Sequence, residues 1–280
     1  MRGSNSTSTS EAIQYNVVSR RNALQKLEDT GPIMEERRLL PEYNHVCTRT
    51  AFYPTSKPWT AIGKVQTPTR SCTGILVGPS LMLTSQCCVD DAITHNSQMS
   101  FTPAYYDGNA PFGSAYSTWY WWDNRYSGCS TEMNNQAAFN YVVVKLDRRI
   151  GDSAGYWCFK AFDRSWGGEQ WNAKNYWHRI GYAGDISNAQ RPFYVEAAHP
   201  MWFCCSDCGC KEYENNQGAV SYLMTTTLFS EEYDNDSGDP IYGTINGELC
   251  VVGLMTMSYR HGIVAGGPGL EALIQAHKYD

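Results

Sequence analysis

From residue 47 onward, the hydrophobic positions fall in short runs that are separated by glycine, proline, asparagine and serine. Examples are TAIGKVQ at 60–66, YVVVKL at 141–146, AVSYLMTTT at 219–227 and PIYGTI at 240–245. Short runs rich in Val, Ile, Thr and Tyr are typical of β-strands. Their number predicts an all-β protein built from sandwiches or barrels.

The last apolar segment, PGLEALIQAHK at 268–278, follows a different period. Its residues Leu270, Leu273, Ile274 and His277 recur at helical spacing, and Pro268 stands at the expected first position of a helix. We therefore expect one convincing helix, at the C-terminal end of the sequence.

Residues 1–45 differ from the rest because they are polar, rich in both charges and free of cysteine. We interpret them as an N-terminal extension or pro-segment. The opening Met-Arg-Gly-Ser lacks the apolar core of a secretory signal and looks like a vector-derived leader. We therefore expect the sequence to begin after a removed signal, and unconventional export is the alternative.

The charge, hydrophobicity and cysteine content of the sequence argue against several classes of function. The 280 residues carry a net charge of −6 and no long basic run, which argues against nucleic-acid binding. No stretch of about 18 apolar residues is present to span a membrane. The chain contains 11 cysteines, a content typical of an oxidising compartment, so we expect a secreted protein. Because 11 is odd, at least one cysteine lacks a disulfide partner within the chain.

Several segments carry recognisable chemistry in a fixed order: CTGILVGP at 72–79, LTSQCCV at 83–89, NYVVVKL at 140–146, IGYAGD at 180–185, NDSGDPI at 235–241 and VGLMT at 252–256. Together they resemble the chymotrypsin-like serine peptidases, and within them the glutamyl endopeptidase (V8-like) branch. The resemblance covers about residues 47–280. It implies two six-stranded antiparallel β-barrels with the active site in the cleft between them. We expect the extension over 1–45, the first barrel over 46–155, and the second barrel with its C-terminal helix over 156–280.

The sequence departs from this family at the catalytic positions. Where the family has its histidine this sequence has Cys87, and where it has its aspartate this sequence has Asn140; the serine remains as Ser237. In the triad, imidazole accepts the serine proton and a buried carboxylate stabilises the imidazolium. A protonated thiol and a neutral amide perform neither task.

The loops around the serine depart as well. The resemblance assigns the oxyanion loop to Asn235, Asp236 and Ser237, with Asn235 at a family glycine. We expect Asp239 to bring an unfavourable negative charge beside the developing oxyanion. The resemblance assigns the substrate pocket to Met255 and Thr256, with Met255 replacing the histidine that receives a substrate carboxylate in glutamyl endopeptidases.

Cys87 has three interpretations: an unpaired thiol that packs like a small apolar side chain, a disulfide partner, or a nucleophile with an unconventional base. We favour the first, because the resemblance already implies a disulfide between Cys72 and Cys88. An unpaired Cys87 also accounts for the odd count.

Other cysteines are harder to assign from the sequence. We prefer a disulfide-stapled loop over a metal site for the cluster Cys204–Cys210, and we regard Cys129 and Cys158 as plausible partners. The positions Cys47 and Cys250 stay unassigned.

The run YSTWYWWD at 116–123 concentrates aromatic residues. Strict alternation along a strand buries only every second ring, so at least some of Trp119, Tyr120, Trp121 and Trp122 stay near the surface. Such a run suits either a core or an exposed recognition platform.

These features favour a secreted pseudopeptidase that binds a protein or peptide in the inter-barrel cleft, with no nucleic acid or membrane as partner. The alternative is an active serine or Cys87-dependent endopeptidase or acyl hydrolase with a replacement base, such as His95 or another histidine. No Gly-rich phosphate loop, EF-hand or H-E-x-x-H helix is present, so no cofactor or metal is expected at the site.

Overall fold

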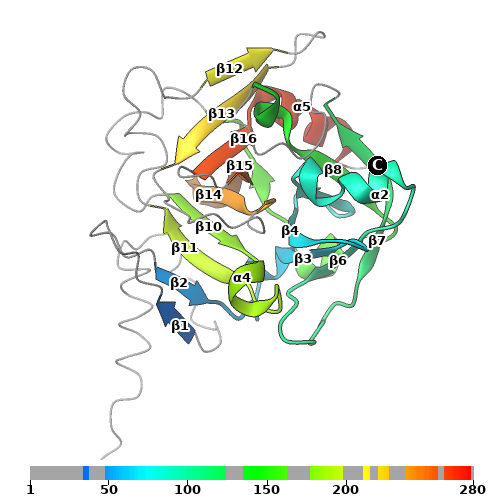
Figure 1. Ribbon diagram of the computed structural model, residues 1–280, viewed down its shortest axis with the longest axis vertical. Helices are drawn as coiled ribbons and strands as arrows, with labels where there is room; N and C mark the ends of the chain where they lie inside the picture. Colours follow the sequence, from blue (N-terminus) through cyan, green and yellow to red (C-terminus); the bar gives the residue numbers. More distant parts are fainter. Residues whose placement is uncertain are drawn as a thin grey trace, which may run out of the picture.

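The structure is a computed structural model of the chain, shown in Figure 1. It describes residues 34–37, 48–123, 135–162, 177–197, 211–214, 220–226, 237–257 and 262–278. Within these ranges the protein consists mainly of β-strands, as the short apolar runs predict.

The first half forms a closed barrel, which confirms the expected all-β architecture there. Going round the barrel the strands follow the order β3-β4-β5-β8-β7-β6. Their bounds are Ile62–Gln66, Ser71–Leu76, Leu81–Thr84, Val142–Leu146, Ala115–Trp122 and Ser100–Pro103, respectively. All pairs in this barrel are antiparallel.

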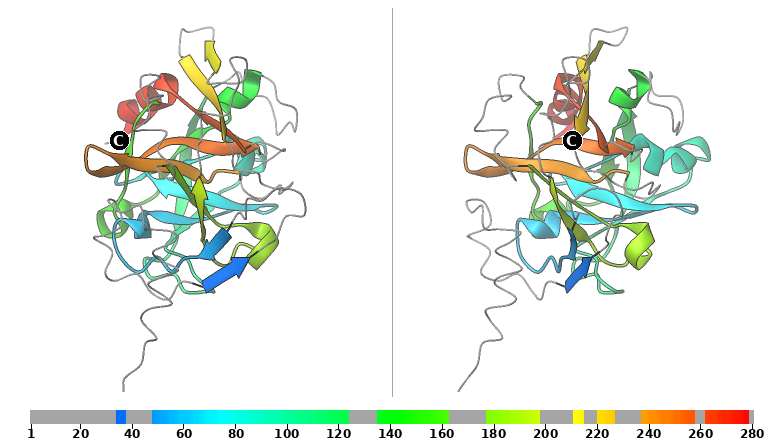
Figure 2. Two further views of the ribbon diagram at one scale, coloured as in Figure 1. Left: turned by 90° about the vertical axis from the view of Figure 1, so that its left-hand side faces the viewer. Right: turned by 60° about the vertical axis from the view of Figure 1, so that its left-hand side comes forward.

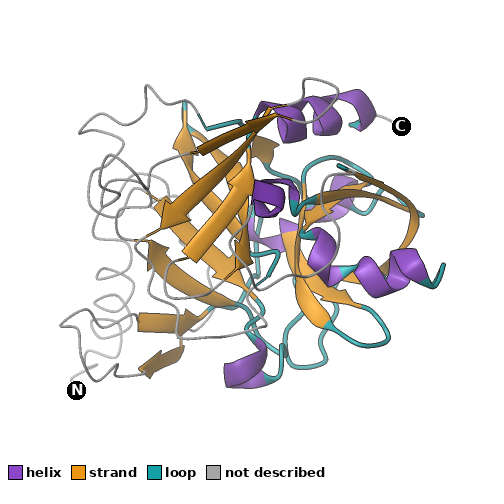
Figure 3. Ribbon diagram, turned by 45° about the horizontal axis from the view of Figure 1, so that its top comes forward, coloured by secondary structure: helices purple, strands orange, loops and turns teal. Residues whose placement is uncertain are grey.

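The second half forms a ten-stranded sheet, separated from the barrel in Figure 3. Among the described residues it follows the open path β1-β2-β11-β10-β14-β15-β16-β13-β12, and β9 pairs with β15 in parallel. In this path order the strands are Met34–Arg37, Thr48–Ala51, Phe193–Ala197, Trp177–Gly181, Pro240–Ile245, Glu248–Met257, Gly262–Gly266, Val220–Thr226 and Lys211–Glu214, with β9 at Cys158–Phe159.

The first two strands do not follow the expected division of the chain. β2 pairs with β11, and β1 pairs with β2, so both add to the second sheet rather than to the first barrel. Backbone pairing with a distant strand leaves no mark in local hydrophobic periodicity, which explains why the expected boundary near residue 46 does not separate the two sheets.

Helical elements are short, apart from the C-terminal helix. The 3₁₀ turns η1, η2 and η3 span Trp59–Ala61, Gln86–Cys88 and Asn135–Phe139, and the helices α2, α3, α4 and α5 span Asp90–Thr94, Gly151–Ala154, Gly184–Ser187 and Pro268–His277. The predicted C-terminal helix is thus confirmed as α5. It buries Leu270 and Ile274 and stacks His277 on Trp121 of β7, so the end of the chain is attached to the first barrel. None of the helices in the described ranges combines the length and apolar character needed to cross a bilayer.

One hydrophobic core joins the two halves. It includes Val65 and Val143 of the barrel together with Val251 of the second sheet. At its centre, the ring of Trp157 packs edge-on against Trp59 and Tyr242, with centroid distances of 5.4 and 4.7 Å. Strand β14 packs against β4, and the two views of Figure 2 show this contact between the orange and cyan strands. The shared core fixes the two halves relative to each other at the seam where the candidate site lies.

Candidate active site

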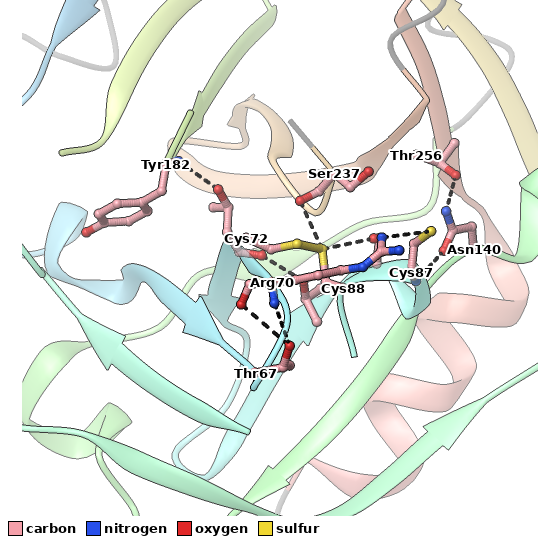
Figure 4. Close-up of a disulfide and its surroundings, with 12 residues drawn as sticks. Thr67, Arg70, Cys72, Cys87, Cys88, Asn140, Tyr182, Ser237 and Thr256 are labelled. Atoms are coloured by element: carbon pink, nitrogen blue, oxygen red, sulfur yellow. Dashed lines mark hydrogen bonds between the residues drawn. A yellow bond between two sulfur atoms is a disulfide. The ribbon is translucent and has the colours of Figure 1, made fainter. Parts of the chain in front are cut away.

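The positions that the resemblance assigns to catalysis come together at the seam between the barrel and the second sheet (Figure 4). Cys87 lies in η2 just after β5, and Asn140 lies just before β8. Because β5 and β8 pair antiparallel, with Thr84 opposite Val142, the end of one strand lies beside the start of the other. The pairing of β5 with β8 therefore brings Cys87 and Asn140 together.

Asn140 is the structural centre of this site and is only 1% exposed. Its Oδ1 accepts a hydrogen bond from the backbone N–H of Cys87 at 3.1 Å. Its Nδ2 donates to Oγ1 of Thr256, which lies in β15 at an irregularity between Met255 and Met257. The amide uses both its acceptor and its donor, and a carboxylate in the same place has no hydrogen to donate to Thr256.

Cys87 is disulfide-bonded, which corrects the expectation of an unpaired thiol. Its partner lies outside the described residues, because the other described cysteines pair with one another. The guanidinium of Arg70 approaches the sulfur, with Nη1 3.9 Å from Sγ. A sulfur in a disulfide carries no thiolate, so in this state Cys87 is neither a base nor a nucleophile.

The predicted disulfide between Cys72 and Cys88 is confirmed, and it lies directly beside Ser237. The Sγ of Cys88 lies 3.2 Å from the carbonyl oxygen of Ser237 and accepts a hydrogen bond from the Ser85 hydroxyl at 3.3 Å. Asn235 and Asp236, the other expected members of the oxyanion loop, lie outside the described residues.

Gly238 fixes the turn that carries Ser237. Its φ of +89° lies in the left-handed region, and an added Cβ would lie 2.5 Å from the carbonyl oxygen of Thr73 and 2.6 Å from Oγ1 of Thr84. Glycine is required here because neither the backbone angle nor the space suits a side chain. The turn is thus packed directly on the first barrel.

Met255 and Thr256, the expected pocket residues, are both buried. The carbonyl of Met255 accepts a hydrogen bond from the N–H of Gly238 at 2.9 Å, and its N–H donates to the carbonyl of Asp239 at 2.8 Å. Met255 therefore supports the Ser237 turn through its backbone, and Thr256 supports Asn140 through its hydroxyl.

The carboxylate of Asp239 is buried beside the guanidinium of Arg179. Its Oδ2 lies 3.7 Å from Nε of Arg179 in β10, and the two side chains are only 4% and 3% exposed. A guanidinium therefore compensates the negative charge of this carboxylate, while its effect on a developing oxyanion stays a prediction.

The described histidines make contacts elsewhere. The ring of His95 contacts the carbonyl oxygen of Asp91 at 2.9 Å, at the exposed end of α2. The ring of His178 contacts the hydroxyl of Tyr194, and burial lowers its pKa to about 4. The ring of His277 stacks on Trp121. These contacts do not direct an imidazole toward Ser237, and the remaining histidines lie outside the described residues.

Two further expectations are resolved away from the site. Cys158 pairs with Cys250, so the proposed pairing of Cys158 with Cys129 was wrong. Those two cysteines sit on β9 and β15, whose parallel pairing is not visible in the sequence. Cys47, Cys129 and the Cys204–Cys210 cluster lie outside the described residues.

Among the aromatics, Trp119 is 61% exposed, which confirms that part of the run from residue 116 remains at the surface.

Two residues at the site, Arg179 and Arg70, were not predicted from the sequence. Arg179 gave no signal, because it lies on a strand far from Ser237 in sequence. Arg70 precedes the Cys72 motif by only two residues but belongs to no motif. The strand resemblance pointed to Thr256 as a pocket residue, but not to its hydrogen bond with Asn140.

Comparisons with known proteins agree with this architecture. No family model matches the sequence. A glutamyl endopeptidase of Bacillus licheniformis is 23% identical over 205 residues, and the match covers 65% of this chain and 63% of that protein. A solved Glu endopeptidase in complex with MPD has a TM-score of 0.58 and 19% identity, covering 83% of this chain and 97% of that one. The protease Anisep from Arthrobacter nicotinovorans has a TM-score of 0.51 and 13% identity, covering 80% of this chain and 98% of that one.

The likenesses to solved structures concern the fold, and the sequence match spans less than two thirds of the Bacillus protein. The likeness in fold agrees with the closed barrel and the second sheet. The chain is therefore similar in sequence to a glutamyl endopeptidase, and it is similar in fold to a solved Glu endopeptidase and to the protease Anisep.

Proposed function

We propose that this protein is a secreted pseudopeptidase that binds a protein or peptide in the cleft between its two halves, with little or no hydrolysis. The observation that carries the proposal is the hydrogen bonding of Asn140, whose neutral amide is engaged by the Cys87 N–H and the Thr256 hydroxyl. A serine protease needs a base beside its serine and a carboxylate to stabilise the charged base. In this chain the matching positions hold a disulfide sulfur and an amide.

The size of the expected loss follows from triad chemistry. Replacing the triad aspartate by asparagine alone lowers kcat about 10⁴-fold in the well-studied serine protease case. Here the histidine position is altered as well. What persists is the scaffold: the Ser237 turn stays bonded to β15 and packed on the barrel. A site that keeps its shape without its base supports binding rather than turnover.

Two properties support the remaining parts of the proposal. The protease relatives act on peptide bonds, so a protein or peptide is the ligand class that the inherited cleft suits. The described residues include two complete disulfides, Cys72–Cys88 and Cys158–Cys250, which fit an oxidising, extracellular environment.

The test measures turnover and binding on the same protein. The oxidised protein and its Ser237→Ala variant are incubated with a fluorescent peptide library, and new N-termini are identified by mass spectrometry, with a glutamyl endopeptidase as positive control. Retained peptides are measured in parallel by affinity capture. We expect no Ser237-dependent cleavage and equal peptide retention by both forms. Cleavage that disappears in the Ser237→Ala variant would instead establish the active hydrolase.

A further inference from the structure

A buried charge pair lies directly behind the Ser237 turn. Asp239 comes two residues after Ser237, at the entrance to β14, and Arg179 lies in the neighbouring strand β10. The two strands pair antiparallel with Arg179 opposite Ile241. Continuing this register places Gly181 opposite Asp239, so Arg179 lies diagonally across from the carboxylate on the same face.

The glycine at position 181 leaves space for the carboxylate of Asp239. An ideal Cβ on Gly181 would lie 1.7 Å from Oδ1 of Asp239, so the carboxylate occupies the place where any other residue at 181 would have its side chain. The guanidinium of Arg179 supplies the compensating charge at 3.7 Å. Arg179, Gly181 and Asp239 therefore form one unit, in which a glycine makes room for an acid and an arginine neutralises it.

This unit is linked to the Ser237 turn through the backbone of Asp239. The carbonyl of Asp239 accepts the N–H of Met255, and the adjacent Gly238 donates its own N–H back to Met255. The turn is thereby held to β15 by its backbone and to β10 by the side chain of residue 239. A buried carboxylate that loses its cation moves toward water, and such a movement pulls directly on this turn.

We propose that Arg179 is a positioning residue that acts through Asp239 to hold the Ser237 turn in the cleft. This proposal rests on the proposed function only in naming the cleft as the ligand site. The arrangement it describes is a property of the unliganded protein. Its test needs no ligand, so its failure is distinguishable from a failure of the proposed function.

The experiment is amide hydrogen exchange on the full chain, followed by NMR at two reporters, the N–H groups of Gly238 and Met255. Arg179→Met removes the cation and keeps most of the side-chain length. We expect both reporters to exchange at least about tenfold faster, while the amides of Leu83 and Val143, paired between β5 and β8, keep their rates. A merely structural role would raise exchange in both places together.

Two further variants keep the test decisive. Gly181→Ala leaves both charges in the chain but displaces the carboxylate, so it should accelerate exchange at the same two reporters even where Arg179→Met does not fold. Arg191→Met is the matched control, because it breaks a half-exposed ion pair with Asp107 at 2.8 Å and should leave both reporters unchanged. Unchanged rates at Gly238 and Met255 in folded Arg179→Met or Gly181→Ala would overturn the proposal.

Discussion

The two hydrogen bonds of the Asn140 amide should contribute measurably to the free energy of unfolding. Asn140→Leu keeps a side chain of similar size but removes both the acceptor for the Cys87 N–H and the donor to the Thr256 hydroxyl. Each hydrogen bond contributes about 1 kcal/mol net, and a buried donor left unsatisfied costs about 1–3 kcal/mol. Because Asn140 is only 1% exposed, water does not replace these partners. We expect the free energy of unfolding to fall by about 2–4 kcal/mol.

The assay is equilibrium urea unfolding of the oxidised protein, followed by tryptophan fluorescence. Asn109→Leu is the matched control, because Asn109 is exposed and its amide donates to Tyr53 at 3.3 Å. We expect that control to change stability by less than about 0.5 kcal/mol. Thr256→Val completes a double-mutant cycle, in which a coupling of about 1 kcal/mol with Asn140→Leu measures their shared hydrogen bond. If Asn140→Leu lowers the free energy of unfolding no more than Asn109→Leu does, the two hydrogen bonds of Asn140 do not stabilise the fold.

Three other predictions concern the rest of the molecule. Burial lowers the pKa of His178 to about 4, so its contribution to stability is complete above the unfolded pKa of about 6.5 and is lost as pH falls toward 4. This loss reaches up to about 3 kcal/mol and should disappear from the pH profile of unfolding in His178→Gln. Trp119→Ser should cost less than about 0.5 kcal/mol in urea unfolding because the ring is exposed, whereas Trp157→Ala in the core should cost about 3–5 kcal/mol; similar costs would contradict the packing. Iodoacetamide should modify Cys87 only after reduction, because the cysteine is disulfide-bonded. If mass spectrometry finds Cys87 modified in the oxidised protein, Cys87 is an unpaired thiol instead.

Local patterns were enough to predict the strand-rich fold and the helix at the C-terminus. Alternation and short apolar runs reflect burial on one barrel face, and the spacing of Leu270 and Ile274 reflects the buried side of α5. The disulfide between Cys72 and Cys88 followed from the family resemblance, because both cysteines lie within recognisable motifs.

What the sequence could not predict depends on contacts between distant strands. Asp239 comes two residues after Ser237, and this position alone predicts no charge partner for it. Its actual partner, Arg179, is brought to it only by the pairing of β10 with β14. Cys158 likewise meets Cys250 through a parallel strand pair. Register between such strands is set by the whole sheet, and local sequence carries little of it.

Whether Ser237 has a functional base can be measured by labelling with a fluorophosphonate probe, which reacts with an activated serine. The probe is incubated with the oxidised protein at neutral pH, and a glutamyl endopeptidase serves as positive control, with the adduct mapped by mass spectrometry. We expect the control to be labelled stoichiometrically while Ser237 stays unmodified over the same time. Rapid stoichiometric labelling of Ser237, absent from Ser237→Ala, would contradict this expectation.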